Sequence, residues 1–248
     1  MATTIAISGK GGSGKTSVAA MIIRTLLERA DSGAVLAVDA DPNSCLGITL
    51  GVEPASTIAD IREDARAKAP GNTGMDKLRT VQYAIQQAIV ESKGFDLLTM
   101  GRPEGPSCYC AVNNMLRKFL DDLSSRYPFV IIDNEAGMEH LSRRTTSNVD
   151  ILCIVTNPTA VGLVTARRIY DLAGQLPIGV GRIGVTWNNV TDTESVEQEI
   201  GNVVETFGHI PYDTAVFDGS MQGTTVFDLE QSNPALEAVR NMLEHILV

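Results

Sequence analysis

Short apolar segments recur along the chain and alternate with longer stretches whose apolar residues follow a helical spacing. The short segments are nearly continuous in apolar character, which is typical of strands that are buried on both faces of a parallel sheet. The sequence predicts such strands at 4–8, 34–38, 96–100, 129–132, 151–155 and 182–186, with a weaker pattern near 206–210.

The stretches between these segments carry the periodicity of amphipathic helices. We expect helices at about 15–30, 57–68, 76–92, 111–126, 139–148, 159–174, 192–203 and 233–247. Strands that alternate with helices predict an α/β fold, with a mostly parallel, doubly wound sheet and helices on both faces. Segment 69–74 contains Pro and Gly, but strands resume after it, so we expect one domain over residues 1–248.

A glycine-rich loop joins the first predicted strand to the first predicted helix. Residues 9–16 read Gly-Lys-Gly-Gly-Ser-Gly-Lys-Thr, and consecutive glycines let backbone N–H groups point inward at a polyphosphate. In a phosphate-binding loop Lys15 reaches the β- and γ-phosphate oxygens, and the Thr16 hydroxyl is a ligand of Mg²⁺. The strand before the loop and the helix after it are the context that this motif requires. The predicted nucleotide contacts are Gly11, Gly12, Ser13, Gly14, Lys15, Thr16 and Ser17.

Carboxylates follow two other predicted strands, at the edge where ligands bind in open parallel sheets. Asp39 and Asp41 come after the second strand, and Asp133 comes directly after the apolar run 129–132. A carboxylate at this edge can order a water for attack on the γ-phosphate or hold Mg²⁺. With a phosphate-binding loop upstream, an apolar run that ends in Asp is the Walker B pattern, which predicts that Asp133 binds Mg²⁺. Helix capping is the alternative for Asp39 and Asp41.

Polar residues after the last two predicted strands are candidates for binding a base. Asn188 follows strand 182–186, while Pro211 and Asp213 follow the weaker strand near 206–210. An asparagine amide offers both a donor and an acceptor, which suits the edge of adenine. The alternative for Asn188 is an ordinary turn residue.

The spacing of the four cysteines suggests a metal site. Cys108 and Cys110 form a Cys-x-Cys pair after the glycine- and proline-containing stretch 101–107. One pair half fills a tetrahedral site for a soft metal, and two chains related by a two-fold axis would supply four thiolates. The spacing alone is equally compatible with redox chemistry. Cys45 and Cys153 lie among apolar residues, a pattern typical of buried free cysteines.

Charge and composition limit the partners. The net charge of −10 argues against general binding to nucleic acid and against attraction to anionic membranes. No apolar run approaches the roughly 20 residues of a membrane span, and the N-terminus enters a strand without the pattern of a signal peptide. We therefore expect a cytoplasmic protein that binds neither nucleic acid nor membrane.

The segment from Lys10 to Thr16 resembles the deviant Walker A signature of the MinD, ParA and nitrogenase iron protein class of ATPases. Asp41 and Pro42 are similar to switch I of that class, and 133–137 is similar to switch II. The resemblance implies a homodimeric P-loop ATPase that converts ATP to ADP and phosphate with Mg²⁺. It implies that Lys10 reaches the partner's nucleotide and stabilises charge on the γ-phosphate, as an arginine finger does elsewhere. It also implies that Asp41 activates water and that Asn188 contacts adenine.

Within that class, residues 100–110 and 133–144 resemble the CooC-type accessory proteins that help to mature nickel-containing carbon monoxide dehydrogenase. The resemblance covers essentially the whole chain. It implies that Cys108 and Cys110 of two chains bind one nickel or zinc ion between the subunits. It also implies ATP-driven insertion of nickel into the active-site cluster of a carbon monoxide dehydrogenase or an acetyl-CoA synthase complex. Both metals accept four sulfurs, so the sequence leaves the choice of metal open.

Three other functions would use the same ATP site. A spatial organiser like MinD or ParA needs a basic helix or patch, which the sequence lacks. An electron carrier like the nitrogenase iron protein has well-separated cysteines, one of them near switch II, whereas switch II of this chain has none. Adjacent cysteines can still hold an iron–sulfur cluster across an interface, so this alternative stays open. A pure interaction protein would use ATP only as a dimerisation switch, whereas Asp41 favours hydrolysis.

Overall fold

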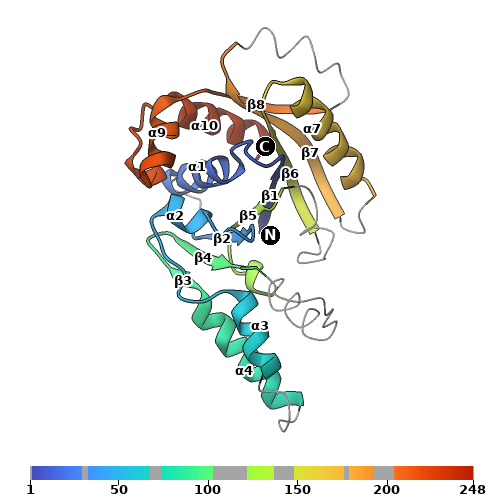
Figure 1. Cartoon of the computed structure of the whole chain (residues 1–248), viewed down its shortest axis with the longest axis vertical. Helices are drawn as coiled ribbons and strands as arrows, with labels where there is room; N and C mark the ends of the chain where they lie inside the picture. The colour runs from blue at the N-terminus through green and yellow to red at the C-terminus, as the bar shows by residue number, and fades with distance from the viewer. Residues whose placement is uncertain are drawn as a thin grey trace.

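An eight-stranded sheet forms the centre of the protein (Figure 1). The computed structural model describes residues 2–29, 33–67, 74–102, 122–136, 148–175, 179–192 and 204–247. The strands are β1 (Thr3–Gly9), β2 (Val35–Ala40), β3 (Val90–Glu91), β4 (Phe95–Thr99), β5 (Phe129–Asn134), β6 (Asn148–Thr156), β7 (Gly179–Val190) and β8 (Glu205–Pro211). Their order is β3-β4-β2-β5-β1-β6-β7-β8, and the pairs are parallel except for the short antiparallel pair β3–β4.

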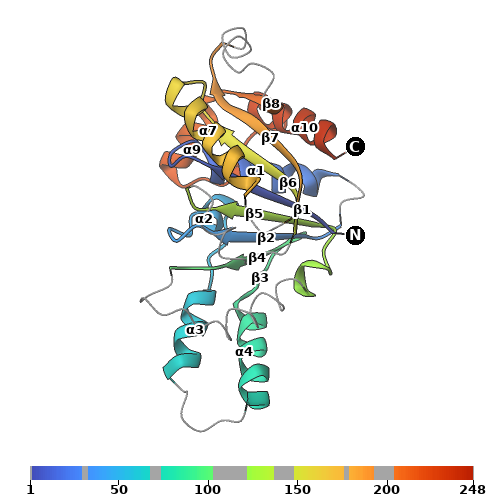
Figure 2. The same ribbon diagram turned by 90° about the vertical axis from the view of Figure 1, so that its right-hand side faces the viewer.

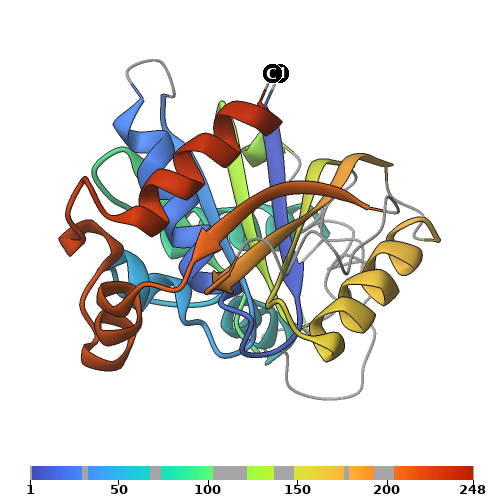
Figure 3. The same cartoon turned by 90° about the horizontal axis from the view of Figure 1, so that it is seen from above.

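Helices cover both faces of the sheet. They are α1 (Lys15–Glu28), α2 (Leu46–Leu50), α3 (Ile58–Ala67), α4 (Gly74–Ala88), α7 (Ala160–Ala173), α9 (Thr214–Gln222) and α10 (Pro234–Ile246), with a 3₁₀ turn, η2 (Val226–Asp228). Figure 3 shows α1 and α10 on one face and α7 on the other. Alternate residues of β1 serve the two cores: Ile5 and Ile7 pack beneath α1 and α10, while Ala6 belongs to the core that includes residues of α3, α4 and α7.

A helical hairpin extends beyond one edge of the sheet. Figure 2 shows α3 and α4 side by side, leading away from the end of the sheet where β3 and β4 lie. The start of α3 is fixed to the sheet, because Ala59 N–H donates to the carbonyl of Met100, just after β4, at 2.9 Å. The position after Met100 needs glycine, since Gly101 has φ +69° and a Cβ there would overlap the Thr57 side chain.

The predicted fold class is confirmed, and each predicted strand is present with boundaries that differ by a few residues. Two short helices were missed. The α2 helix has only five residues and α9 only nine, which is shorter than the window over which a helical period can be recognised. The helix predicted over 76–92 ends at Ala88, and β3 follows it. The helix predicted over 139–148 is wrong at its end, because β6 begins at Asn148, while 137–147 lies outside the described residues.

Candidate nucleotide site

The loop between β1 and α1 occupies the carboxyl edge of the sheet, where two glycines are required by close contacts. A Cβ at Gly9 would overlap the carbonyl oxygen of Val155 on the neighbouring strand β6. Gly14 has φ +88°, and a Cβ there would overlap the side-chain amide of Asn188. The loop can therefore turn sharply against β6 and β7 only because these positions carry no side chain.

The N-terminus of α1 is suited to an anion. Its N-cap, Gly14, provides no side-chain hydrogen bond, and the first turn contains no acidic residue. The first amide groups of the helix are thus left for a ligand, and the helix dipole favours a negative one. Lys15 is only 7% exposed, and its Nζ donates to the Lys10 carbonyl at 3.3 Å, which holds the ammonium group against the loop.

Thr16 and Asp133 meet as the Walker B prediction requires. The Thr16 hydroxyl donates to Oδ2 of Asp133 at 2.7 Å, although the two residues are far apart in the sequence. Asp133 is fully buried, and its Oδ1 finds no hydrogen-bond partner among the described residues. Burial raises the pKa of Asp133 to about 7. A buried carboxylate with a free oxygen beside a hydroxyl provides the hard oxygen ligands that Mg²⁺ prefers, so this donor set fits the cation.

Asp39 organises the segment that follows β2. It is fully buried and lies in register with Asp133 on the adjacent strand β5. Its carboxylate accepts hydrogen bonds from the backbone N–H of Leu46 at 2.9 Å and of Asp41 at 3.2 Å. Burial raises the pKa of Asp39 to about 6. Its carbonyl accepts from Met100 N–H at 2.8 Å, so one residue holds both the turn after β2 and the chain after β4.

Asp41 and Lys10 lie nearer to solvent than the residues they would assist. Asp41 is partly exposed, and its Oδ1 accepts from the backbone and side-chain nitrogens of Asn43, both at 2.8 Å. Lys10 is exposed on the phosphate-binding loop. Within the described residues, neither side chain is hydrogen-bonded to Thr16 or Asp133, and the catalytic roles of Asp41 and Lys10 remain predictions.

The three predicted base-binding residues have different environments. Asn188 is buried, and its side-chain nitrogen donates to the Ser13 carbonyl at 2.8 Å, which ties β7 to the phosphate-binding loop. A register shift between Trp187 and Val190 and a left-handed Asn189 place that amide at the loop. Pro211 ends β8, and Asp213 caps α9 by accepting from Val216 N–H at 3.0 Å. Contact of these residues with adenine stays a prediction.

The predicted metal pair, Cys108 and Cys110, lies outside the described residues, as does Gly137 of switch II. Among the residues that the structure does describe, no group of three His, Cys, Asp or Glu side chains could hold a metal ion. Cys153 is buried as expected, but the prediction for Cys45 is wrong, because that cysteine is exposed just before α2. The apolar residues around Cys45 in the sequence belong to a helix that buries only one side.

Sequence reasoning missed the part played by Asn134. Its side-chain nitrogen donates to the Ile7 carbonyl at 2.9 Å, so it joins the ends of β5 and β1 beneath the loop. Its Oδ1, like the Ser13 hydroxyl, is buried with no hydrogen-bond partner in the described part of the chain. The one available signal was its position directly after Asp133, at the end of a strand.

Comparison with known proteins identifies the family. Residues 4–226 match the CobQ/CobB/MinD/ParA nucleotide binding domain, CbiA. An ATP-binding protein of Methanocaldococcus jannaschii is 41% identical, covering 98% of this chain and 98% of its own length. The carbon monoxide dehydrogenase accessory protein CooC of Rhodospirillum rubrum is 32% identical, covering 91% of this chain and 89% of its own. A chain of the MinC:MinD cell division protein complex of Aquifex aeolicus shares the fold, with a TM-score of 0.73 at 21% identity over 99% of this chain and 96% of that chain.

The chain therefore belongs to the CobQ/CobB/MinD/ParA nucleotide-binding family. It is a P-loop ATPase, as the loop, the Thr16–Asp133 pair and the parallel sheet together indicate. Across the described residues, no helix is long and apolar enough to span a membrane.

Proposed function

We propose that this ATPase is a dimeric metallochaperone that inserts nickel into the active-site cluster of a carbon monoxide dehydrogenase or an acetyl-CoA synthase complex. One observation carries the proposal: a Cys-x-Cys pair, Cys108 and Cys110, occurs in a chain that is 32% identical to CooC over 91% of its length. Two chains would contribute four thiolates, a set that binds nickel or zinc. Nickel is then the cargo, and the nucleotide site provides the energy.

The residues around the loop would bind ATP and Mg²⁺ in stated roles. Amide groups from Gly11 to Ser17 would surround the phosphates, Lys15 would neutralise the β- and γ-phosphates, and Thr16 with Asp133 would hold Mg²⁺. The bound cation supplies charge neutralisation for the transferred phosphoryl group. The buried and unpartnered Oδ1 of Asp133 supports this assignment, because a cation would satisfy it.

Hydrolysis would require a second chain. Asp41 would orient the attacking water and accept its proton, while Lys10 of the partner would neutralise charge on the γ-phosphate. The partial exposure of Asp41 and the exposure of Lys10 support a role at an interface between subunits, since both are available to a facing molecule. Hydrolysis to ADP would then release the contacts that hold the two chains closed.

Asp39 supplies a physical connection between the nucleotide site and the cysteine loop. Its carboxylate holds the turn that contains Asp41, and its carbonyl holds Met100, directly before the segment 101–110. A movement of the turn after β2 would therefore be transmitted through Asp39 to Met100, the residue that precedes segment 101–110. This supports ATP-dependent control of the distance between the two cysteine pairs.

The test is metal content after anaerobic nickel loading. We expect about one nickel per two chains in the wild type, and loss of nickel in Cys108→Ala/Cys110→Ala. Cys45→Ala is the matched control, because it removes an exposed thiol from the described part of the chain and should keep the metal. Equal nickel in the wild type and the double variant, or none in either, would contradict the proposal. It would leave a nucleotide-switch ATPase like MinD or ParA.

A further inference from the structure

An unpaired hydroxyl is buried beside Asp39. Thr99, the last residue of β4, is 1% exposed, and its hydroxyl has no hydrogen-bond partner in the part of the chain that the structure describes. Thr99 is paired in register with Asp39 on the parallel strand β2. Paired residues of neighbouring strands lie on the same face of a sheet, and the strands are only about 4.8 Å apart. The Thr99 hydroxyl therefore lies next to the Asp39 carboxylate without a hydrogen bond between them.

A buried hydroxyl without a partner is unfavourable. Valine has nearly the same shape as threonine and would fill this position without the cost of removing an unpaired hydroxyl from water. Native proteins pair almost all of their buried polar groups, so an exception calls for a physical reason. A hydroxyl that is unpaired in one arrangement of the protein and paired in another supplies such a reason.

The Asp39 carboxylate is bonded to the chain segment that follows β2. Its Oδ1 accepts from the backbone N–H of Asp41 at 3.2 Å, and its Oδ2 accepts from the backbone N–H of Leu46 at 2.9 Å. Both donors lie in segment 41–46. The pairing of this buried carboxylate therefore depends on where that segment lies.

Segment 41–46 is bonded in a way that conflicts with catalysis by Asp41. Oδ1 of Asp41 accepts from the backbone and side-chain nitrogens of Asn43, both at 2.8 Å, which fills the two acceptor positions of that oxygen. Ser44 has φ +51°, a left-handed conformation that is uncommon in residues with a side chain and stores strain. Asp41 has to give up the bonds to Asn43 before Oδ1 can orient a water, and the short segment that ends at Leu46 then moves with it.

We propose that Thr99 is a positioning residue: its hydroxyl replaces the Leu46 N–H as a donor to Asp39 when segment 41–46 rearranges around bound ATP. A change of side-chain rotamer brings the hydroxyl to the carboxylate. Without this donor the rearrangement would leave a buried carboxylate oxygen unpaired, and that cost would oppose it. The inference rests on the role proposed for Asp41 and not on the nickel site.

The exchange of donors also acts on the end of β4. Met100 N–H donates to the Asp39 carbonyl at 2.8 Å, so Thr99 and Met100 would hold the same aspartate through its side chain and its backbone. In the ATP-bound state Asp39 is then joined more firmly to β4, and less firmly to segment 41–46, than it is in the present structure. The Thr99 hydroxyl thus favours ATP binding and destabilises the nucleotide-free protein, so its two effects have opposite signs.

Thr99→Val tests both effects, because it removes the hydroxyl and keeps the shape. We expect the affinity for a non-hydrolysable ATP analogue to fall about tenfold. The affinity for ADP should stay unchanged, because ADP has no γ-phosphate for Asp41 to face. The urea midpoint of the nucleotide-free protein should stay the same or rise. Thr99→Ser keeps the hydroxyl and should restore the affinity for the analogue. Competition with a fluorescent nucleotide gives the affinities at one fixed chain concentration.

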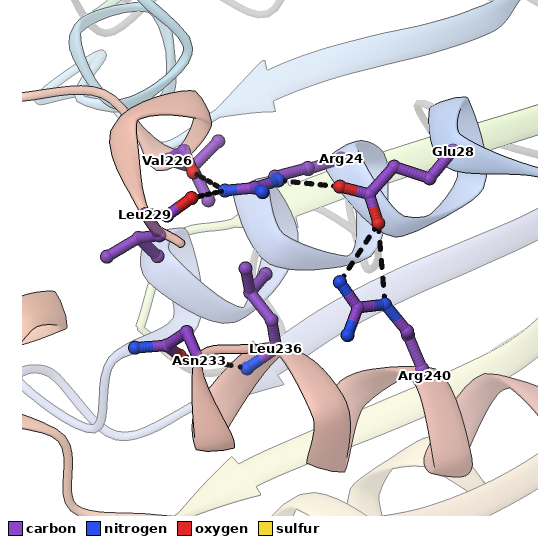
Figure 4. A network of polar contacts seen from close by, with 7 residues as sticks. All are labelled: Arg24, Glu28, Val226, Leu229, Asn233, Leu236 and Arg240. Atoms are coloured by element: carbon purple, nitrogen blue, oxygen red, sulfur yellow. Dashed lines mark hydrogen bonds and ion pairs between the residues drawn. The ribbon is translucent and has the colours of Figure 1, made fainter. Parts of the chain in front are cut away.

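Thr25→Val is the matched control. Thr25 on α1 is 4% exposed, and its hydroxyl also has no partner among the described residues. Its surroundings are fixed, because the neighbouring Arg24 donates to the carbonyls of Val226 at 2.6 Å and Leu229 at 2.8 Å and to the carboxylate of Glu28 (Figure 4). We expect Thr25→Val to leave the affinities for ADP and for the ATP analogue unchanged.

Four results would overturn the role of Thr99. They are wild-type affinities in Thr99→Val, equal losses of affinity for ADP and the analogue, a matching loss in Thr25→Val, and a fall in the urea midpoint of Thr99→Val. The last would show that the hydroxyl has a partner in the absence of nucleotide.

A background of Asp41→Ala separates this inference from the function on which it rests. Because Thr99 acts through the rearrangement that Asp41 requires, Thr99→Val should have no effect on the analogue in a chain that already carries Asp41→Ala. A loss of the same size in both backgrounds would overturn the inference. If Asp41→Ala alone keeps full ATP turnover, the proposed role of Asp41 fails and this inference fails with it. If Asp41→Ala is inactive and Thr99→Val behaves as the wild type, only this inference fails.

Discussion

The two halves of the nucleotide site are held in different ways. On the phosphate side, Lys15 and Asp133 are buried, and hydrogen bonds between distant segments hold Asp133 to Thr16 and Asn188 to the loop. On the hydrolytic side, Asp41 is bonded within its own turn, and Lys10 is exposed. The phosphate side is therefore built before a nucleotide arrives. The hydrolytic side needs further contacts to become ordered for catalysis.

The largest expected effect is a loss of ATP turnover on substitution of the hydrolytic residues Lys10 and Asp41. Lys10→Ala should lower ATP turnover about 10³-fold and leave ATP binding intact, because the lysine would act only on transition-state charge. Asp41→Ala should also be inactive. A mixture of the two variants should recover about a quarter of wild-type turnover, since half of the dimers are mixed and each holds one site with both groups. Turnover by phosphate release is the measurement, and a mixture as inactive as its components would place Lys10 in the same chain as its nucleotide.

The buried carboxyl groups on the phosphate side should make the stability of the protein depend on pH. The folded-state pKa values of Asp133 and Asp39, about 7 and about 6, lie above their ordinary value of 3.8. Between about pH 4 and pH 7 the folded metal-free protein then binds more protons than the unfolded chain. The contribution of these two carboxyl groups to the free energy of unfolding is therefore largest below about pH 4. It is lost, at about 1.4 kcal/mol per pH unit for each group, as the pH rises from about 4 through the folded-state pKa values.

Urea denaturation in chelator at pH 4.5 and pH 7.5 measures this change. Asp133→Asn should flatten the dependence, because an amide does not ionise. If the free energy of unfolding changes with pH in Asp133→Asn and in Asp39→Asn as it does in the wild type, the buried carboxylates do not cause the pH dependence.

A smaller effect should distinguish two roles for Asn188. Asn188→Ala removes the hydrogen bond to Ser13 and should weaken ATP, GTP and tripolyphosphate alike, about tenfold, if the amide acts by holding the loop. A loss confined to ATP would instead show contact with adenine. Asn189→Gly is the control, because glycine keeps the left-handed conformation, and its affinities should match the wild type. Competition with a fluorescent nucleotide gives all three constants.

The smallest effect lies away from the site. Burial raises the pKa of Glu28, but hydrogen bonds from Arg24 and Arg240 outweigh that and leave it below the ordinary value of 4.5. Its stabilising contribution is then present above pH 4.5 and lost as the pH falls through the lowered folded-state pKa, the opposite direction to Asp133. Glu28→Gln should lower the free energy of unfolding at pH 7 by less than about 1 kcal/mol, because the pair is partly solvated. The difference should shrink as the pH falls below 4.5, and a difference that stays constant over that range would contradict the ion-pair origin.

Local sequence was enough to predict the phosphate-binding loop and every described strand except β3. Each of those strands contains a short apolar run, and Gly9 to Thr16 is a contiguous motif, so neither depends on knowledge of distant residues. The two residues of β3 carry no such pattern and fell inside a predicted helix. The Thr16–Asp133 pair was predicted because two contiguous motifs come at the same edge of a parallel sheet.

Contacts that depend on strand order could not be predicted. The amide of Asn188 meets the loop through the placement of β7 beside β6 and a bulge after Trp187, which no local pattern records. Asp39 accepts hydrogen bonds with both its carboxylate and its carbonyl. To predict both bonds, one must know that β2 lies beside β4. Exposure of Cys45 depends on which side of a five-residue helix faces the core.

The hairpin of α3 and α4 can act as a lever arm. Its attachment through Ala59 and Met100 lies one residue from the start of the segment 101–110, and α3 has ten residues, a length of about 15 Å. A tilt of about 10° at that attachment would move the far end of α3 by roughly 3 Å. A rearrangement too small to detect at Met100 would thus be magnified at the far end of α3, where a spectroscopic label would report it without touching the catalytic residues.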